Sequence, residues 1–101
     1  MDDLRDLAAR LEGASGTLSD LARRLPYAGP AASAFTVDAP GLPGEVGRAL
    51  HAQWLAALDN RARELAAAAE QLADGAAAVR AADQAYADSD DGAAGRLARE
   101  R

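Results

Sequence analysis

Leucines near the start of the chain recur with the seven-residue spacing of a helix that packs along one side. One row contains Leu4, Leu11, Leu18 and Leu25, and a companion row has leucine at positions 7 and 21 with alanine between them at 14. Residues at these spacings lie close together on the surface of an α-helix. The pattern predicts an amphipathic helix with a continuous apolar stripe.

Charged residues and a proline mark the limits of this first helix. Asp2 and Asp3 favour a helix N-terminus, Arg23 and Arg24 occupy the expected last turn, and Pro26 cannot continue the helix. We therefore expect a helix at about residues 2–25. All four prolines of the chain lie in residues 26–43, which predicts an irregular connector packed onto the helices.

A second helical pattern follows the connector and is expected at about residues 44–87, with residues 88–101 forming a frayed extension or tail. Its leading row spaces Leu58, Leu65, Leu72, Val79 and Tyr86 by seven, and alanines form most of the companion row until Asp83 interrupts it. Upstream of Leu58 the apolar residues are four apart and include Trp54, the only tryptophan. These rows predict a second packing surface on a long helix.

Composition limits how well such a chain could fold alone. Alanine accounts for 29 of the 101 residues and aromatic residues for only four, so two helices would enclose a thin core. We therefore expect a single domain, residues 1–101, of all-α class: an antiparallel helical hairpin that pairs into a four-helix bundle. The residues expected to pack against the partner are Leu4, Leu7, Leu11, Leu18, Leu21, Leu25, Trp54, Leu58, Leu65, Leu72 and Val79; we call this set the apolar seam.

The net charge, the lengths of the apolar runs and the start of the sequence limit which partners, and which routes into or across a membrane, we expect. A net charge of −5 argues against binding to nucleic acid or to an anionic membrane surface. No apolar run approaches the roughly 20 residues that span a bilayer, so membrane insertion is not expected. The acidic start lacks the pattern of a cleaved secretory signal.

Residues suited to catalysis, cofactors or metals are scarce. The chain has one histidine, His51, which we interpret as a half-buried packing residue, and it has no cysteine. The acidic run before Gly92 has alanine at positions where an EF-hand needs ligands, so it does not predict a calcium site. The sequence therefore predicts no catalytic residue, no cofactor and no metal, and we do not expect an enzyme.

One pair near the end of the second helix remains unexplained by packing alone. Tyr86 and Asp90 are four residues apart, which on a helix places the phenol and the carboxylate on one side. Tyr86 also occupies the last position of the heptad row, so a packing role and a recognition role are both open.

Several segments together resemble the EspC-like secretion targets of the actinobacterial type VII (ESX) pathway, within the WXG superfamily. The similarity covers the two heptad helices, the middle stretch from Ala34 to Glu45 and the ending from Ala82 to Asp90. In that family a tyrosine followed four places later by an acid is the export signal read by the secretion ATPase, which Tyr86 and Asp90 match. Trp54-Leu55-Ala56 differs from the family's Trp-X-Gly motif and lies inside the second helix.

The resemblance implies a non-enzymatic substrate or co-secreted partner of a type VII secretion system. Its partners would be itself or a second helical-hairpin protein, in a homo- or heterodimer, and the secretion ATPase. It would fold in the cytoplasm and then be secreted or displayed at the cell surface. The alternative is a cytoplasmic helical adaptor, chaperone or targeting factor for a larger protein such as a toxin.

Overall fold

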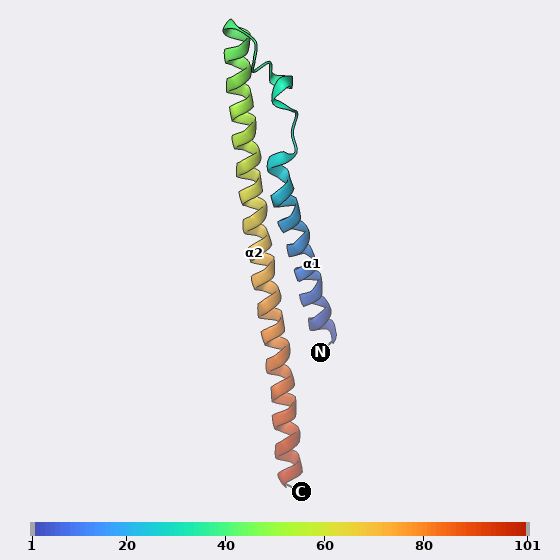
Figure 1. The fold of residues 1–101 in the computed structure, drawn as a ribbon. Coiled ribbons are helices and arrows are strands. Elements are labelled where there is room, and N and C mark those ends of the chain that lie inside the picture. Colours follow the sequence, from blue (N-terminus) through green and yellow to red (C-terminus); the bar gives the residue numbers. More distant parts are fainter. Residues whose placement is uncertain (1, 101) are drawn as a thin grey trace. The chain divides into compact units, whose positions relative to one another are not determined.

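A computed structural model describes residues 2–100, and within them the fold is all-α without a strand. Helix α1 spans Asp2–Arg24, helix α2 spans Gly41–Glu100, and two short 3₁₀-helices, Leu25–Tyr27 and Ala32–Phe35, lie between them (Figure 1). The all-α prediction and the two-helix organisation are thus confirmed. Met1 and Arg101 of the predicted domain lie outside the described residues.

The helix boundaries follow the local sequence. Helix α1 ends just before the 3₁₀-helix that contains Pro26, where a further α-helical turn would lack a backbone donor. Gly41 begins α2 with a φ of 70°, a left-handed value that glycine adopts without a Cβ clash, and Pro43 follows within the first turn. Helix α2 continues to Glu100, whereas the sequence pattern predicted its end at about residue 87.

The chain forms two compact units, and the first of them pairs an early segment with a late one. The first unit combines the chain up to Gly16 with the chain from Ala69 onward, and the second is Thr17–Ala68. In the first unit, two bonds between α1 and α2 give the direction of the helices. Arg5, near the start of α1, bonds Asp83, and the Ser15 hydroxyl, later in α1, donates to the carbonyl of Ala69, which is earlier in α2. The two segments are therefore antiparallel.

Alanine supplies all of the buried apolar side chains in the described part of the chain. These are Ala8, Ala22, Ala62, Ala69 and Ala76, and no large side chain there is fully buried. The leucines at 4, 11 and 18 and those at 58, 65 and 72 are half-buried beside the alanines. The two helices thus meet through small side chains, and each leucine keeps part of its apolar surface in water.

The companion row of α1 lies largely outside the contact with α2. Leu7 and Leu21 are each 45% exposed and Ala14 is exposed, while Ala8 and Ala22 of the adjacent row are buried. When the apolar stripe of a helix is wide, only part of it can contact a single neighbouring helix. The contact with α2 uses the alanine side of the stripe and leaves the Leu7 and Leu21 side open.

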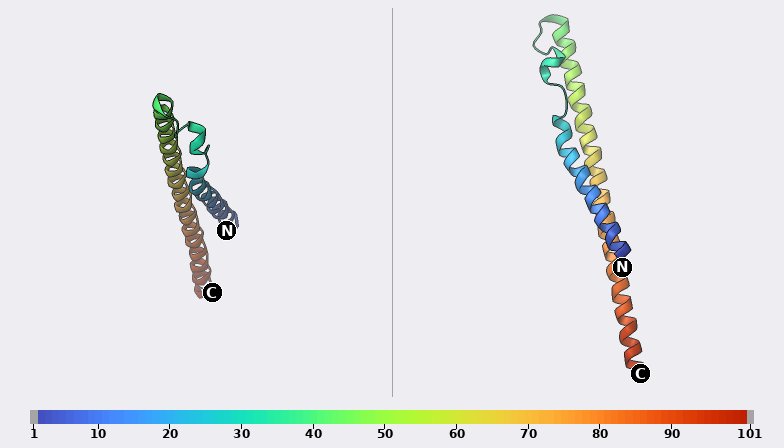
Figure 2. Two further views of the ribbon diagram at one scale, coloured as in Figure 1. Left: turned by 45° about the horizontal axis from the view of Figure 1, so that its top comes forward. Right: turned by 90° about the vertical axis from the view of Figure 1, so that its right-hand side faces the viewer.

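In the second unit the connector lies beside the start of α2 (Figure 2). The Arg48 guanidinium donates to the Val37 carbonyl at 2.9 Å, and the Thr36 hydroxyl donates to the Pro43 carbonyl at 3.3 Å. The Phe35 ring meets His51 with 5.1 Å between centroids, so His51 is the half-buried packing residue that the sequence predicted. The connector is accordingly a packed segment, as expected.

Gly47 allows the connector backbone to lie directly on α2. A Cβ at this position would overlap the Phe35 carbonyl oxygen, and backbone atoms cannot move aside as a flexible side chain would. We predict that Gly47→Ala displaces the connector and lowers the free energy of unfolding by about 1–3 kcal/mol. Urea unfolding followed by Trp54 fluorescence measures this effect.

Gly16 provides the matched control for that substitution. A Cβ there would have no neighbour within 4 Å, so Gly16→Ala is expected to raise the free energy of unfolding by up to about 1 kcal/mol through helix propensity. If Gly47→Ala stabilised the protein as Gly16→Ala does, the close packing of the connector on α2 would be refuted.

Candidate functional site

The candidate recognition pair, Tyr86 and Asp90, lies on a stretch of α2 that has no α1 residues alongside it. Asp83 is at the level of Arg5, close to the start of α1, and α2 continues beyond that start in the first unit (Figure 1). Seventeen residues of α2, 84–100, therefore follow Asp83 and its bond to Arg5 of α1. We call residues 84–100 the α2 extension.

The sequence of the α2 extension favours a helix even without a partner helix. Alanines at 85, 87, 93, 94 and 98 have the highest helix propensity, and Arg96 and Arg99 place positive charge near the negative end of the helix dipole. Gly92 and Gly95 each oppose this by about 1 kcal/mol relative to alanine. The alanines outnumber the glycines, which explains why α2 does not stop at residue 87.

Tyr86 and Asp90 are both available to a partner molecule. Tyr86 is 56% exposed, Asp90 is exposed, and the side chain of neither forms a hydrogen bond or an ion pair with another residue of the range 2–100. The intervening Asp88 differs, because its carboxylate accepts a hydrogen bond of 3.0 Å from the Gln84 amide. The helix therefore presents a phenol ring and a carboxylate one turn apart.

A polar cluster holds α1 against α2 next to this pair. The Arg5 guanidinium lies 3.2 Å from the Asp83 carboxylate, which is only 9% exposed. One turn away, Arg80 donates two hydrogen bonds of 2.7 and 2.8 Å to the Glu12 carboxylate. These bonds hold the pKa of Glu12 below its ordinary value, so the pair stabilises the fold at neutral pH and loses that contribution as the pH falls through the lowered pKa.

The apolar seam is placed partly inside and partly outside the contacts between α1 and α2. Leu4, Leu11, Leu18, Leu25, Leu58, Leu65, Leu72 and Val79 are half-buried, whereas Leu7, Leu21 and Trp54 are exposed by 43–45%. Leu25 belongs to the first 3₁₀-helix and not to α1. The two-helix arrangement thus leaves apolar surface on every member of the seam.

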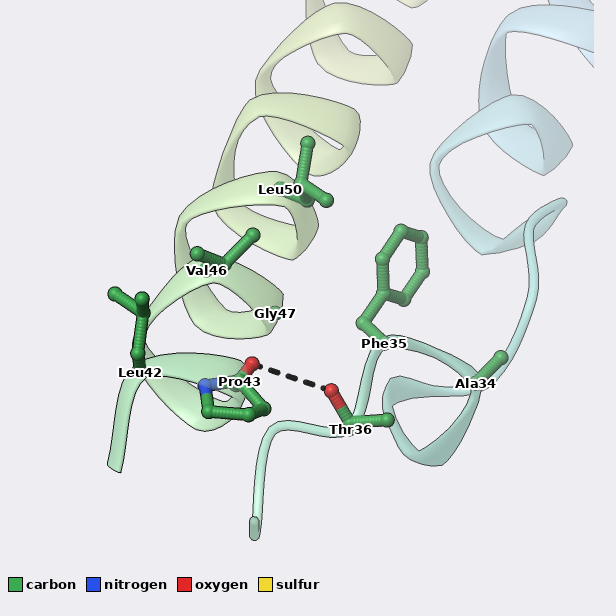
Figure 3. A pocket seen from close by; sticks show the side chains of 8 residues that line it. All are labelled: Ala34, Phe35, Thr36, Leu42, Pro43, Val46, Gly47 and Leu50. Carbon is green, nitrogen blue, oxygen red and sulfur yellow. Dashed lines mark hydrogen bonds between the residues drawn. The ribbon is translucent and has the colours of Figure 1, made fainter. Parts of the chain in front are cut away.

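An open apolar groove occupies the other end of α2, within the second unit. Its volume is about 470 Å³, and its lining includes Phe35 of the connector and, on α2, Leu42, Val46 and Leu50 (Figure 3). These three side chains are 48–69% exposed. They follow one another at four-residue spacing; the sequence pattern indicated this for Val46 and Leu50, and Leu42 extends it by one step. Connector residues line the rest of the groove.

Sequence reasoning missed two features of these sites. It identified Asp83 as an interruption of the apolar row but did not assign Arg5 as its partner, although a carboxylate in a buried row requires a cation or a donor nearby. It also treated the predicted connector, residues 26–43, only as a packed segment, whereas Phe35 and Leu42 within that range line the groove. The four-residue spacing from 42 to 54 was the available signal for the groove's α2 wall.

Comparisons with family models, with curated proteins and with solved structures found no match to this chain. Among the described residues, no helix has both the length and the apolar character needed to cross a membrane. That same part of the chain has no group of three or more His, Cys, Asp or Glu side chains placed to hold a metal ion.

Proposed function

We propose that this protein is a non-enzymatic substrate or co-secreted partner of a type VII secretion system, of the EspC-like kind. The observation that carries the proposal is the exposure of Tyr86 and Asp90 together on the α2 extension. An exposed aromatic ring beside a fixed negative charge suits a pocket with an apolar floor and a basic rim. In this proposal that pocket belongs to the secretion ATPase, and the protein leaves the cytoplasm for the medium or cell surface.

Helix pairing is the second part of the proposal. The leucines of the seam are at most half-buried, and alanines alone fill the interior of the described residues. Burial of apolar surface stabilises a folded protein or complex by roughly 25 cal/mol per Å². A partner that covered the leucine surface now in contact with water would therefore add stability. We propose that a second helical hairpin, from this protein or a related one, covers the seam and completes a four-helix bundle.

Pairing has a measurable consequence for stability. A chain stabilised by its partner should melt at a temperature that rises with protein or partner concentration. Changing both Leu7 and Leu21 to serine is expected to weaken this dependence while the helix content stays high, because both residues lie outside the main contact with α2. Circular dichroism melts over a hundredfold range of concentration, alone and with a co-expressed hairpin protein, measure the effect.

The control for this experiment is Tyr27→Ser, since Tyr27 is 89% exposed on the connector and is not part of the seam. Its melts should follow those of the unaltered protein. A chain that remains monomeric, melts at one temperature at every concentration and gains nothing from a hairpin partner would contradict the pairing proposal.

The export part is tested by asking whether the tagged protein reaches the culture supernatant of an actinobacterial host. Supernatant protein that depends on Tyr86 supports the proposal. Protein that stays in the lysate of a host with an active type VII system contradicts it.

A cytoplasmic adaptor or chaperone for a larger protein, such as a toxin, is the second candidate function. The groove between Phe35 and the Leu42, Val46 and Leu50 side favours it, because this surface is distant in sequence from Tyr86 and could hold a helix of a client protein. Its distinguishing sign is a stable complex with the product of a neighbouring gene that survives Tyr86→Ala.

A further inference from the structure

The apolar contacts of the first unit do not by themselves define one alignment of α1 along α2. On α1 the leucines at 4 and 11 are seven residues apart, and on α2 Ala69 and Ala76 are seven apart beside Leu72 and Val79. A slide of one heptad, about 10 Å, would replace alanine by alanine and leucine by a similar apolar side chain. Repetitive rows of this kind need a polar residue to specify register.

Three polar contacts distinguish the observed alignment from a shifted one. Arg5 pairs with Asp83 at 3.2 Å, Arg80 donates two hydrogen bonds to Glu12, and the Ser15 hydroxyl donates to the Ala69 carbonyl at 2.7 Å. Asp83 occupies the position in the row that follows Ala76 and is almost as buried as the alanines. A carboxylate in such a place is stable only with a charged or donor group against it.

A shift of α1 by one heptad toward the C-terminus of α2 would have a specific consequence. Adding one heptad to Asp83 gives Asp90, so Arg5 would come to the level of Asp90, and Tyr86 would enter the row at the level that Val79 holds now. Asp83 would move to the level of Ala76, among alanines and away from Arg5. The slide would thus cover the Tyr86 and Asp90 pair beneath α1.

We infer that Asp83 is a positioning residue: its pairing with Arg5 stops α1 one heptad short of Asp90 and so keeps Tyr86 and Asp90 uncovered. Asp90 and Asp83 compete for the same arginine. Asp83 prevails because its burial penalises every alignment that separates it from Arg5 and from its other contact in the observed alignment. The effect on export rests on the proposed function, whereas the effect on alignment does not.

Engineered cysteine pairs report the alignment directly, since the chain has no cysteine of its own. The Leu11 side chain lies 3.7 Å from the place that a Cβ on Gly75 would take, so Leu11→Cys with Gly75→Cys marks the observed register. Leu11→Cys with Ala82→Cys marks the register shifted by one heptad. With Asp83 in place, we expect oxidation to link the first pair and leave the second pair as free thiols.

Asp83→Ala is expected to reverse in part the preference for the observed register. The substitution extends the alanine row of α2, and Asp90 then remains as the acid of that row with which Arg5 can pair. The Leu11 and Ala82 cysteine pair should then form its disulfide severalfold more than in the parent, with helix content unchanged by circular dichroism. If only the Leu11 and Gly75 pair links in the Asp83→Ala background, the inference is overturned. The same holds if the shifted pair already links in the parent.

A charge exchange keeps the inference testable even if Asp83→Ala unfolds. In Arg5→Asp combined with Asp83→Arg the pair is reversed, and the shifted alignment would set two acids, at 5 and 90, against each other. The double variant should link only the observed-register pair and keep its helix content. Linking of the shifted pair in that double variant would refute the role of this ion pair.

The two proposals fail in different ways. Should Asp83→Ala shift the cross-link while Tyr86→Ala is exported normally, the alignment inference stands and the secretion proposal falls. Should Tyr86→Ala block export while Asp83→Ala leaves both cross-linking and export unchanged, the secretion proposal stands and the alignment inference falls.

Discussion

Replacing Tyr86 by alanine is expected to keep the protein in the cell lysate, with loss of nearly all of the supernatant fraction. Tyr86 is 56% exposed and its side chain forms no hydrogen bond with another described residue, so its removal costs the fold little while it deletes the aromatic part of the Tyr86 and Asp90 pair. Hot-spot aromatics typically cost about 2 kcal/mol or more of binding when truncated. Fractionation of an actinobacterial host, with immunodetection of a tag, measures the result.

Two variants make this experiment specific to the recognition surface. Tyr86→Phe keeps the ring and tests whether the hydroxyl contributes, and Leu97→Ala removes a side chain that is 62% exposed on the same α2 extension. Leu97→Ala should be exported like the unaltered protein. Equal loss of export in Leu97→Ala and Tyr86→Ala would show that the α2 extension acts as a general apolar surface and not through the tyrosine.

Replacing Ala76 by leucine is expected to destabilise the interior of the first unit strongly. Ala76 is 1% exposed in a contact made of small side chains, so the three added carbons must push α1 away from α2. Overpacking of this type costs about 1–3 kcal/mol. Urea unfolding followed by circular dichroism should show the midpoint at lower denaturant.

Ala77→Leu is the matched control, because Ala77 is the next residue of α2 and is exposed. Its effect should be limited to the small difference in helix propensity between alanine and leucine. An Ala76→Leu protein as stable as Ala77→Leu would mean that the helices do not pack through the alanine row.

The sequence alone predicted the helical elements well, since heptad spacing and proline placement act locally. Pro26 set the end of α1 to within two residues, and the Leu58 to Val79 row identified the inner side of α2. His51 was expected to be a half-buried packing residue; the structure confirms this and shows that its ring packs against Phe35.

Other features depend on tertiary contacts and could not be predicted in the same way. The apolar stripe of α1 is wider than one neighbour covers, and the pattern gave no preference between the row with Leu7 and the row with Ala8. The partnership of Arg5 with Asp83 joins residues 78 positions apart, which local spacing cannot reveal. The continuation of α2 past residue 87 reflects many small propensities that no single residue signals.

The central proposal is that this protein leaves the cell by way of a type VII secretion ATPase. The direct measurement compares culture supernatant and lysate from two otherwise identical actinobacterial hosts, one with the ATPase and one without it, each expressing the tagged, unaltered protein. A cytoplasmic marker protein controls for lysis. We predict tagged protein in the supernatant only when the ATPase is present; the same distribution in both hosts would contradict the proposal.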